Sequence, residues 1–212
     1  MLRRKRSVFA ATDGVLAVMR ETDARSARGV DFSSTDGLTE VVRLDFRNSR
    51  LRTEDYEQTD VDGLRVTRKV ICRRLDGVDP GATVTIGGQV FDVTRVDTAA
   101  KTMTLHLSQL VTDGTAMLVR TVVARDTRGE SRRSDVEQPV YVLNGRAGVH
   151  ATQSAGLDGA WPTATITIRA CDYAGETSLI RNGRDYKVTR ATGTGEWLTL
   201  ECEGGAVHHG ER

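Results

Sequence analysis

The sequence predicts an all-β fold made of two tandem small β-barrel-like domains related by internal duplication. Gly88–Arg95 reads GQVFDVTR, and Gly183–Arg190, 95 residues later, reads GRDYKVTR. The alignment continues without a gap to Leu107 and Cys202, and six of its twenty positions are identical. A repeat of this size corresponds to a whole domain, because solenoid units are only about 20–50 residues long. Chance similarity between two strand-rich stretches is the alternative interpretation.

Two further patterns indicate strands in both copies. Residues 103–107 and 198–202 alternate apolar and polar side chains, as half-buried strands do. Gly87-Gly88 and Asn182-Gly183 occupy the same place in the two copies. They are the residue types that two-residue hairpin turns need at positive φ. The sequence therefore predicts matching β-hairpins in the two domains.

We expect about six strands in each domain, joined mostly by short turns, which favours a closed or nearly closed barrel. The first domain, residues 1–113, has its expected strands at 15–20, 40–46, 65–75, 84–86, 89–91 and 103–107. The second domain, residues 114–212, has its expected strands at 117–125, 140–143, 163–170, 179–181, 184–186 and 198–202. The junction is predicted at Thr112–Thr115, without a Pro/Gly/Ser-rich linker.

Four polar stretches match no strand pattern: 22–39 and 48–63 in the first domain, and 126–137 and 145–160 in the second. Long loops in compact domains usually bind partners or order only when a partner arrives. We interpret them as partner-contacting arms; simple flexible loops are the alternative. The candidate inter-subunit residues are Arg50, Arg52, Tyr56, Asp60, His150 and Trp161.

The charge balance is near neutral, with 30 Lys and Arg against 29 Asp and Glu. This balance argues against a general nucleic-acid coat. Basic residues nevertheless cluster locally, and a solvated tip is the alternative to a contact with DNA or a partner. The candidate DNA- or partner-facing residues are Arg3, Arg4, Lys5, Arg6, Arg132 and Arg133.

The sequence predicts no enzyme, cofactor or metal site. The four histidines lack the spacing to Cys, Asp or Glu that a metal site requires, and no phosphate-binding glycine loop or nucleophile elbow occurs. No secretory signal or apolar run of membrane-spanning length is present. Three cysteines without CxxC spacing indicate assembly in a reducing cytoplasm.

The second half of the chain resembles the head-completion proteins of tailed bacteriophages, also called head-tail adaptors or stoppers. The pattern consists of Ile166–Arg169, Gly175-Glu176, Asn182–Val188 and Leu198–Glu203, and Thr121–Arg128 resembles the opening strand and polar loop of that family. The first half fits through Ile86–Leu107 and more loosely before it. The chain departs from the family's single-domain length by carrying two copies.

The resemblance implies a ring-forming β-barrel subunit of the virion neck, between portal and tail, that lines or closes the channel for double-stranded DNA. It implies no catalysis. The implied partners are further copies of the chain, a portal or adaptor ring, and tail-terminator or tail-tube proteins, with assembly in the host cytoplasm and no membrane. Another tail or baseplate ring and a non-phage double β-domain binding protein are the alternatives.

Overall fold

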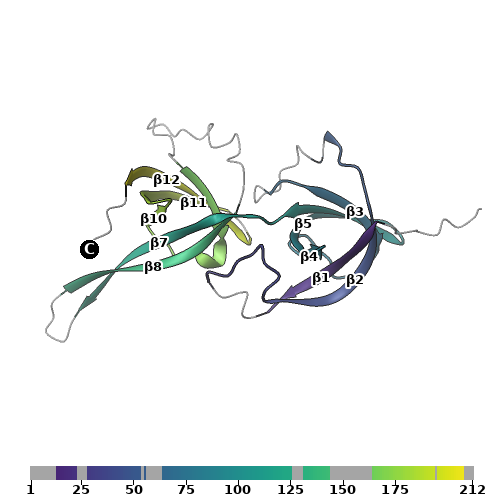
Figure 1. The fold of residues 1–212 in the computed structure, drawn as a ribbon, viewed down its shortest axis with the longest axis horizontal. Coiled ribbons are helices and arrows are strands. Elements are labelled where there is room, and N and C mark those ends of the chain that lie inside the picture. Colours follow the sequence, from purple (N-terminus) through teal and green to yellow (C-terminus); the bar gives the residue numbers. More distant parts are fainter. Residues whose placement is uncertain are drawn as a thin grey trace, which may run out of the picture. The chain divides into compact units, whose positions relative to one another are not determined.

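The computed structural model describes residues 13–22, 28–53, 55, 64–125, 131–143, 164–193 and 195–207, and it confirms the all-β class (Figure 1). The strands form two sheets, each closed into a six-stranded barrel. The strands of the first barrel are β1 (Gly14–Glu21), β2 (Leu38–Asn48), β3 (Arg68–Arg73), β4 (Thr83–Ile86), β5 (Gln89–Thr98) and β6 (Thr102–Gln109). Those of the second are β7 (Thr112–Arg125), β8 (Ser131–Leu143), β9 (Ala164–Arg169), β10 (Ser178–Arg181), β11 (Arg184–Thr192) and β12 (Trp197–Val207).

The two barrels have the same strand order. Around the first the order is β1-β2-β3-β6-β5-β4, and around the second it is β7-β8-β9-β12-β11-β10. Both therefore close by pairing the first strand of the copy with the fourth, β1 with β4 and β7 with β10. Both closing pairs are antiparallel. A shared order of six strands supports duplication beyond the aligned residues.

The correspondence extends to single hydrogen bonds. The Val93 amide donates to the Ala82 carbonyl at 2.9 Å, and the Val188 amide donates to the Thr177 carbonyl at the same distance. Both bonds connect the fifth strand of a copy to the residue before its fourth strand. The predicted turns also match, because Gly88 and Gly183 have φ of 81° and 68°. The predicted matching hairpins are confirmed.

Each barrel has its own apolar core. Alternate residues of the strands point inward, so that Leu16, Val70 and Leu105 are fully buried in the first core. Leu118 and Leu200 occupy the second core in the same way. Cys72 and Cys202 are also buried there, and desolvation raises the pKa of each thiol to about 11. These two cysteines are therefore small apolar core residues.

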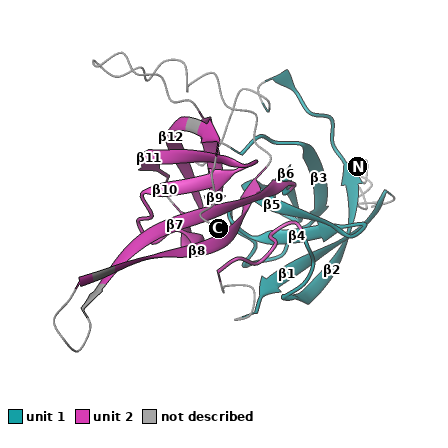
Figure 2. Ribbon diagram, turned by 60° about the vertical axis from the view of Figure 1, so that its left-hand side comes forward, with its two compact units in different colours: residues 1–22, 34–60, 64–110 teal, residues 23–33, 61–63, 111–212 magenta. Residues whose placement is uncertain are grey.

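The chain divides into two compact units, coloured separately in Figure 2. Unit 1 holds the first barrel and unit 2 holds the second, and the division lies between Leu110 and Val111, directly before β7. The stretch Thr112–Thr115, predicted as the junction, is the start of β7. Residues 28–33, which lie between β1 and β2 in the sequence, belong to unit 2.

One predicted loop is wrong. Residues 131–137 of the expected loop 126–137 form the first part of β8 and pair with β7 in a continuous ladder (Figure 1). The Thr121 hydroxyl donates to Asp135 at 2.7 Å across this ladder. β7 meets β10 only at Met117–Val119, so its last six residues have β8 as their strand partner. Because a two-stranded ribbon buries little apolar surface, its strands can have a polar sequence. Such a sequence lacks the apolar alternation that predicts a strand, so a loop was expected here.

Candidate functional site

A charged cluster lies on the outside of the first barrel, where three neighbouring strands each contribute one side chain. Lys69 of β3 is directly opposite His106 of β6, and Asp97 comes from the end of β5. Asp55 completes the cluster from the segment that follows β2. We call these four residues the histidine cluster. The alternation of β6 correctly placed His106 on the polar face, but the covering segment leaves it only 2% exposed.

Both ring nitrogens of His106 face carboxylates. The Nε2 atom lies 2.9 Å from Asp97 Oδ2, and Nδ1 lies 3.4 Å from Asp55 Oδ1. The Lys69 ammonium donates to both oxygens of Asp55, at 3.0 and 3.2 Å. The Arg95 guanidinium lies 2.7 Å from Asp97 on the exposed side. The cluster thus alternates acidic and basic groups, which compensates the burial of its charges.

The carboxylates of the cluster are held in their charged form. Burial by itself raises the pKa of Asp55, but hydrogen bonds from the Arg52 amide and from Lys69 outweigh it and lower the pKa below 3.8. Burial also opposes the shift at Asp97, where hydrogen bonds from His106 and Arg95 lower the pKa. The cluster therefore ties Asp55, and the segment that carries it, to the barrel wall by charged hydrogen bonds.

The geometry of the histidine cluster favours a structural role, in which the cluster holds the Asp55 segment on the barrel, over metal binding or catalysis. Its two carboxylates face opposite sides of the imidazole, so they do not converge on one ion. Within the described ranges no group of three or more His, Cys, Asp or Glu side chains could hold a metal ion. The Ser49 amide adds a hydrogen bond to the Lys69 carbonyl at 2.8 Å. Ser49 and Asp55 are therefore bonded to the outer face of the first barrel, and contact of this stretch with a partner stays a prediction.

A second cluster lies in unit 2, where residues 28–33 are seated. We call this segment the strap and the surface that holds it the socket. Phe32 of the strap is 1% exposed and packs edge-on against Trp197, with ring centroids 4.9 Å apart and an interplanar angle of 89°. The Gly29 amide donates to Asp172 Oδ1 at 2.8 Å. Arg28 donates to Gln138 Oε1 at 3.0 Å and lies 3.9 Å from Glu176.

The floor of the socket is buried and polar. Asp172 is 1% exposed, and burial raises its pKa even though the Gly29 amide, Arg169 and Arg28 oppose the shift. Arg169, at the end of β9, lies 3.4 Å from Glu196. The Trp197 indole N–H has no hydrogen-bond partner among the described residues. The strap thus covers the Asp172 carboxylate and the Trp197 indole.

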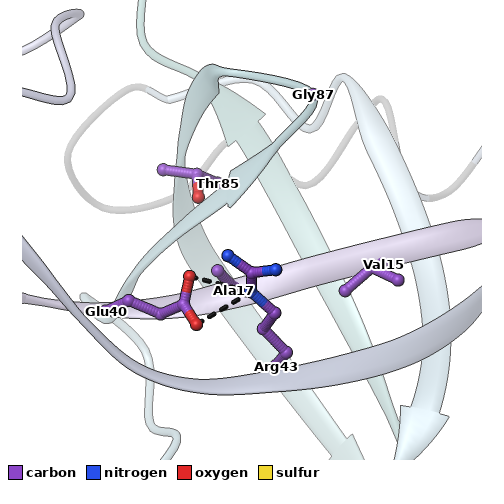
Figure 3. Close-up of a pocket in the computed structure, with 6 residues that line it drawn as sticks. All are labelled: Val15, Ala17, Glu40, Arg43, Thr85 and Gly87. Atoms are coloured by element: carbon purple, nitrogen blue, oxygen red, sulfur yellow. Dashed lines mark hydrogen bonds and ion pairs between the residues drawn. The ribbon is translucent and has the colours of Figure 1, made fainter.

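The first barrel also carries an open concavity of about 290 Å³ on its outer surface (Figure 3). Val15 and Ala17 of β1 line it, together with Glu40, Arg43, Thr85 and Gly87. Figure 3 shows the Arg43 and Glu40 side chains pointing toward each other, and Arg43 Nε is 2.8 and 2.9 Å from the two carboxylate oxygens. Arg43 and Glu40, the two charged residues that line the concavity, therefore neutralise each other.

The structure places only some of the residues predicted for partner contact. Arg50 and Arg52 follow β2 in unit 1 with exposed side chains, Arg133 is exposed on β8 in unit 2, and Arg132 neighbours it in the same strand. The predicted residues Tyr56, Asp60, His150, Trp161, Arg3, Arg4, Lys5 and Arg6 lie outside the described residues.

Sequence reasoning missed both the socket and the strap. One signal was available, because Trp197 opens β12 at the position where the first copy has Thr102. A large aromatic residue in only one of two copies indicates a contact that the other copy lacks. Phe32 gave no comparable signal, since it lies in a polar stretch without strand alternation.

Within the part of the chain that the structure describes, no helix is long and apolar enough to span a membrane. Comparison of the chain with models of known protein families, with curated proteins and with solved structures found no match.

Proposed function

We propose that this protein is a structural subunit of the neck of a tailed-bacteriophage virion, forming a ring between portal and tail that lines or closes the DNA channel. The observation that carries the proposal is the repetition of one closed barrel, with the same strand order, in both halves of the chain. Rigid closed barrels suit a ring component because they have few free strand edges through which to aggregate.

The resemblance to head-completion proteins supports the proposal because of where the matching residues lie in the fold. Its residues fall on β9 (Ile166–Arg169), on the β10–β11 hairpin (Asn182–Val188) and on β12 (Leu198–Glu203). These strands are consecutive around the second barrel, in the order β10-β11-β12-β9. These three parts of the pattern thus lie on four adjacent strands of the second barrel.

The two charged clusters give further support. Both hold a polar segment against a barrel, Asp55 in unit 1 and the strap in unit 2. Segments fixed in this way can present rigid contact surfaces to neighbouring subunits. The near-neutral charge balance would let DNA pass a channel without the strong retention that many phosphate contacts produce.

Mass photometry tests the proposal, with the protein alone and after co-expression with a tailed-bacteriophage portal protein. We expect closed assemblies of defined stoichiometry that bind the portal. Arg52→Glu, at an exposed candidate contact, should weaken assembly, whereas the control Lys101→Glu, on the exposed β5–β6 turn, should not. A protein that stays monomeric and does not bind the portal would refute the proposal and favour a double β-domain binding protein.

A further inference from the structure

The distal parts of β7 and β8 form a two-stranded ribbon that no third described strand joins. β10 pairs with β7 no further than Val119, and the β7–β8 ladder continues past this residue for six more pairs. Among the described residues, β8 pairs with β9 at Leu143 only, at the other end of the strand. We call residues 120–125 and 131–136 the ribbon, and Figure 1 shows it extending away from the body of the second barrel.

The ribbon exceeds what the shared barrel architecture requires. In the first copy, β1 continues for three residues past its last pair with β4, at Val18, and it ends at Glu21. In the second copy, β7 continues for six residues past its last pair with β10. The Thr22 amide and hydroxyl both donate to the Gly37 carbonyl at 2.9 Å, and these bonds close the first ladder where the second one goes on. The ribbon is thus an extension of the second copy.

The sequence of the ribbon and its connection, residues 120–136, is rich in arginine. It contains five arginines, no lysine and three acidic residues, which gives a net charge of +2. The whole chain has a net charge of +1, so the rest of it has a net charge of −1. Four of the five arginines belong to the paired strands: Arg120, Arg125, Arg132 and Arg133. The ribbon is therefore a basic extension of a protein that is otherwise slightly acidic, and its charge attracts polyanions.

Two of these arginines are available for a contact. The side chains of Arg120 and Arg133 are exposed, and neither forms a hydrogen bond or an ion pair with another side chain of the described residues. Asp135, the acidic residue of the paired strands, is instead engaged by the Thr121 hydroxyl, which donates to it at 2.7 Å. Arg133 lies opposite Val123, which is three residues along β7 from Arg120. Because side chains alternate between the faces of a strand, the two arginines lie on opposite faces of the ribbon.

We propose that the ribbon binds double-stranded DNA through the phosphates that border the major groove. This groove is about 12 Å wide in B-form DNA and admits a two-stranded β-ribbon, whereas the major groove of an RNA helix is narrow and deep. A ribbon with an arginine on each face can donate to the phosphates on both sides of the groove, and each guanidinium can donate two hydrogen bonds to one phosphate. The inference rests on the proposed function for the presence of DNA beside the protein. It adds to that function the element of the chain that contacts DNA.

Binding of the full chain to a duplex tests the proposal. The probe is a fluorescein-labelled DNA duplex of mixed sequence, whose anisotropy is measured over a series of NaCl concentrations. A small set of phosphate contacts predicts weak binding, in which the logarithm of the binding constant falls with the logarithm of the salt concentration by about 0.9 per phosphate neutralised. The double variant Arg120→Ala and Arg133→Ala should bind more weakly at low salt, and its slope should be smaller in magnitude by about 2.

Two further double variants serve as controls. The pair Lys187→Ala and Arg190→Ala removes the same charge from two exposed side chains of β11, in the same unit, and it should leave the affinity and the slope unchanged. The pair Arg120→Lys and Arg133→Lys keeps the charge of the ribbon and should keep most of the slope. Circular dichroism shows whether each variant has the strand content of the original protein.

Absence of binding to the duplex at low salt would overturn the proposal. An equal loss in the ribbon pair and in the β11 pair would overturn it as well, because binding would then depend on net charge and not on the ribbon. Equally tight binding to phosphatidylglycerol vesicles would also overturn it, since the ribbon would then take any anionic surface. Mass photometry of the same samples separates these results from the proposed function. Rings that do not bind DNA through the ribbon leave the ring and remove this inference, whereas single copies that bind DNA through the ribbon leave the inference and remove the ring.

Discussion

The Thr94 hydroxyl donates a hydrogen bond to the carbonyl oxygen of His106, 3.1 Å away, where β5 shifts register against β6. At the corresponding place in the second barrel, the Thr189 hydroxyl donates to the carbonyl of Glu201 at 3.0 Å. Each threonine is the extra residue of a β-bulge, and bulges increase the twist that a small barrel needs to close. Both copies have therefore kept the bulge and the threonine whose hydroxyl donates a hydrogen bond there.

Thr189→Val should destabilise unit 2 by about 1 kcal/mol, because it removes one hydrogen bond while keeping the side-chain volume. Urea unfolding followed by circular dichroism measures the loss. Thr189→Ser keeps the hydroxyl and should retain most of the stability. Equal losses for valine and serine would show that the methyl group, and not the hydrogen bond, stabilises the bulge.

The histidine cluster should make unit 1 sensitive to acid. The pKa of Asp55 and that of Asp97 lie below the ordinary 3.8, so the unfolded chain binds protons more readily than the native one. Their stabilisation is present well above pH 3.8 and is lost as the pH falls through the native pKa values. Thermal unfolding between about pH 3 and pH 7 should show this loss, and Asp55→Asn should flatten the acid limb. If Asp55→Asn left the acid limb unchanged, Asp55 would not be a source of the acid sensitivity.

Asp172 should have the opposite effect on how stability depends on pH. Burial raises its pKa in the native protein, so the native state holds this proton more tightly than the unfolded chain. Protonation thus favours folding of unit 2 as the pH falls through the native value toward 3.8, and Asp172→Asn should remove that gain. Hydrogen exchange of β9 and β12 amides measured against pH separates this effect from unit 1. A gain that persists in the asparagine variant would assign it to another group.

Phe32→Ala should loosen the socket and expose Trp197. Truncating a buried phenylalanine costs about 3 kcal/mol or more, and Trp197 loses its ring contact. In a Trp161→Phe background, which leaves Trp197 as the one tryptophan of the sequence, the fluorescence maximum should shift to the red. The conservative change Phe32→Leu should give a smaller shift. An emission spectrum unchanged by Phe32→Ala would mean that the strap does not cover Trp197 in solution.

Gly193→Ala should destabilise the hairpin between β11 and β12 strongly. A Cβ at this position would lie 2.3 Å from the Trp197 carbonyl oxygen, and the backbone φ is +154°. The matched control is Gly87→Ala, where φ is +58° but no atom lies within 4 Å, so that only backbone strain of about 1 kcal/mol is expected. Denaturant midpoints of the two variants should differ clearly. Equal effects would show that the turn relaxes away from Trp197.

The barrels could be predicted from the sequence because their determinants are local and occur twice. The GQVFDVTR repeat, the paired turns and the alternation of 103–107 each depend on neighbouring residues. Antiparallel pairing then follows from the short connections. The closure of β1 on β4 required only that all six strands share one small core.

The candidate sites could not be predicted, because their contacts join residues far apart in the sequence. Asp55 meets His106 and Lys69 only after β3 and β6 have paired, and Phe32 meets Trp197 across 165 positions. Neither Asp55 nor Phe32 follows a periodic pattern. The ribbon of β8 was missed for a related reason, since its residues 131–137 have little apolar surface to alternate.

Cryo-electron microscopy of the protein co-expressed with a tailed-bacteriophage portal protein tests the ring most directly. If the protein is a ring subunit, we expect class averages with closed rotational symmetry. Each repeat should contain two six-stranded barrels, and the central opening should admit duplex DNA. Particles that remain single copies at every concentration, with the portal absent from the purified complex, would contradict a neck ring built from this chain.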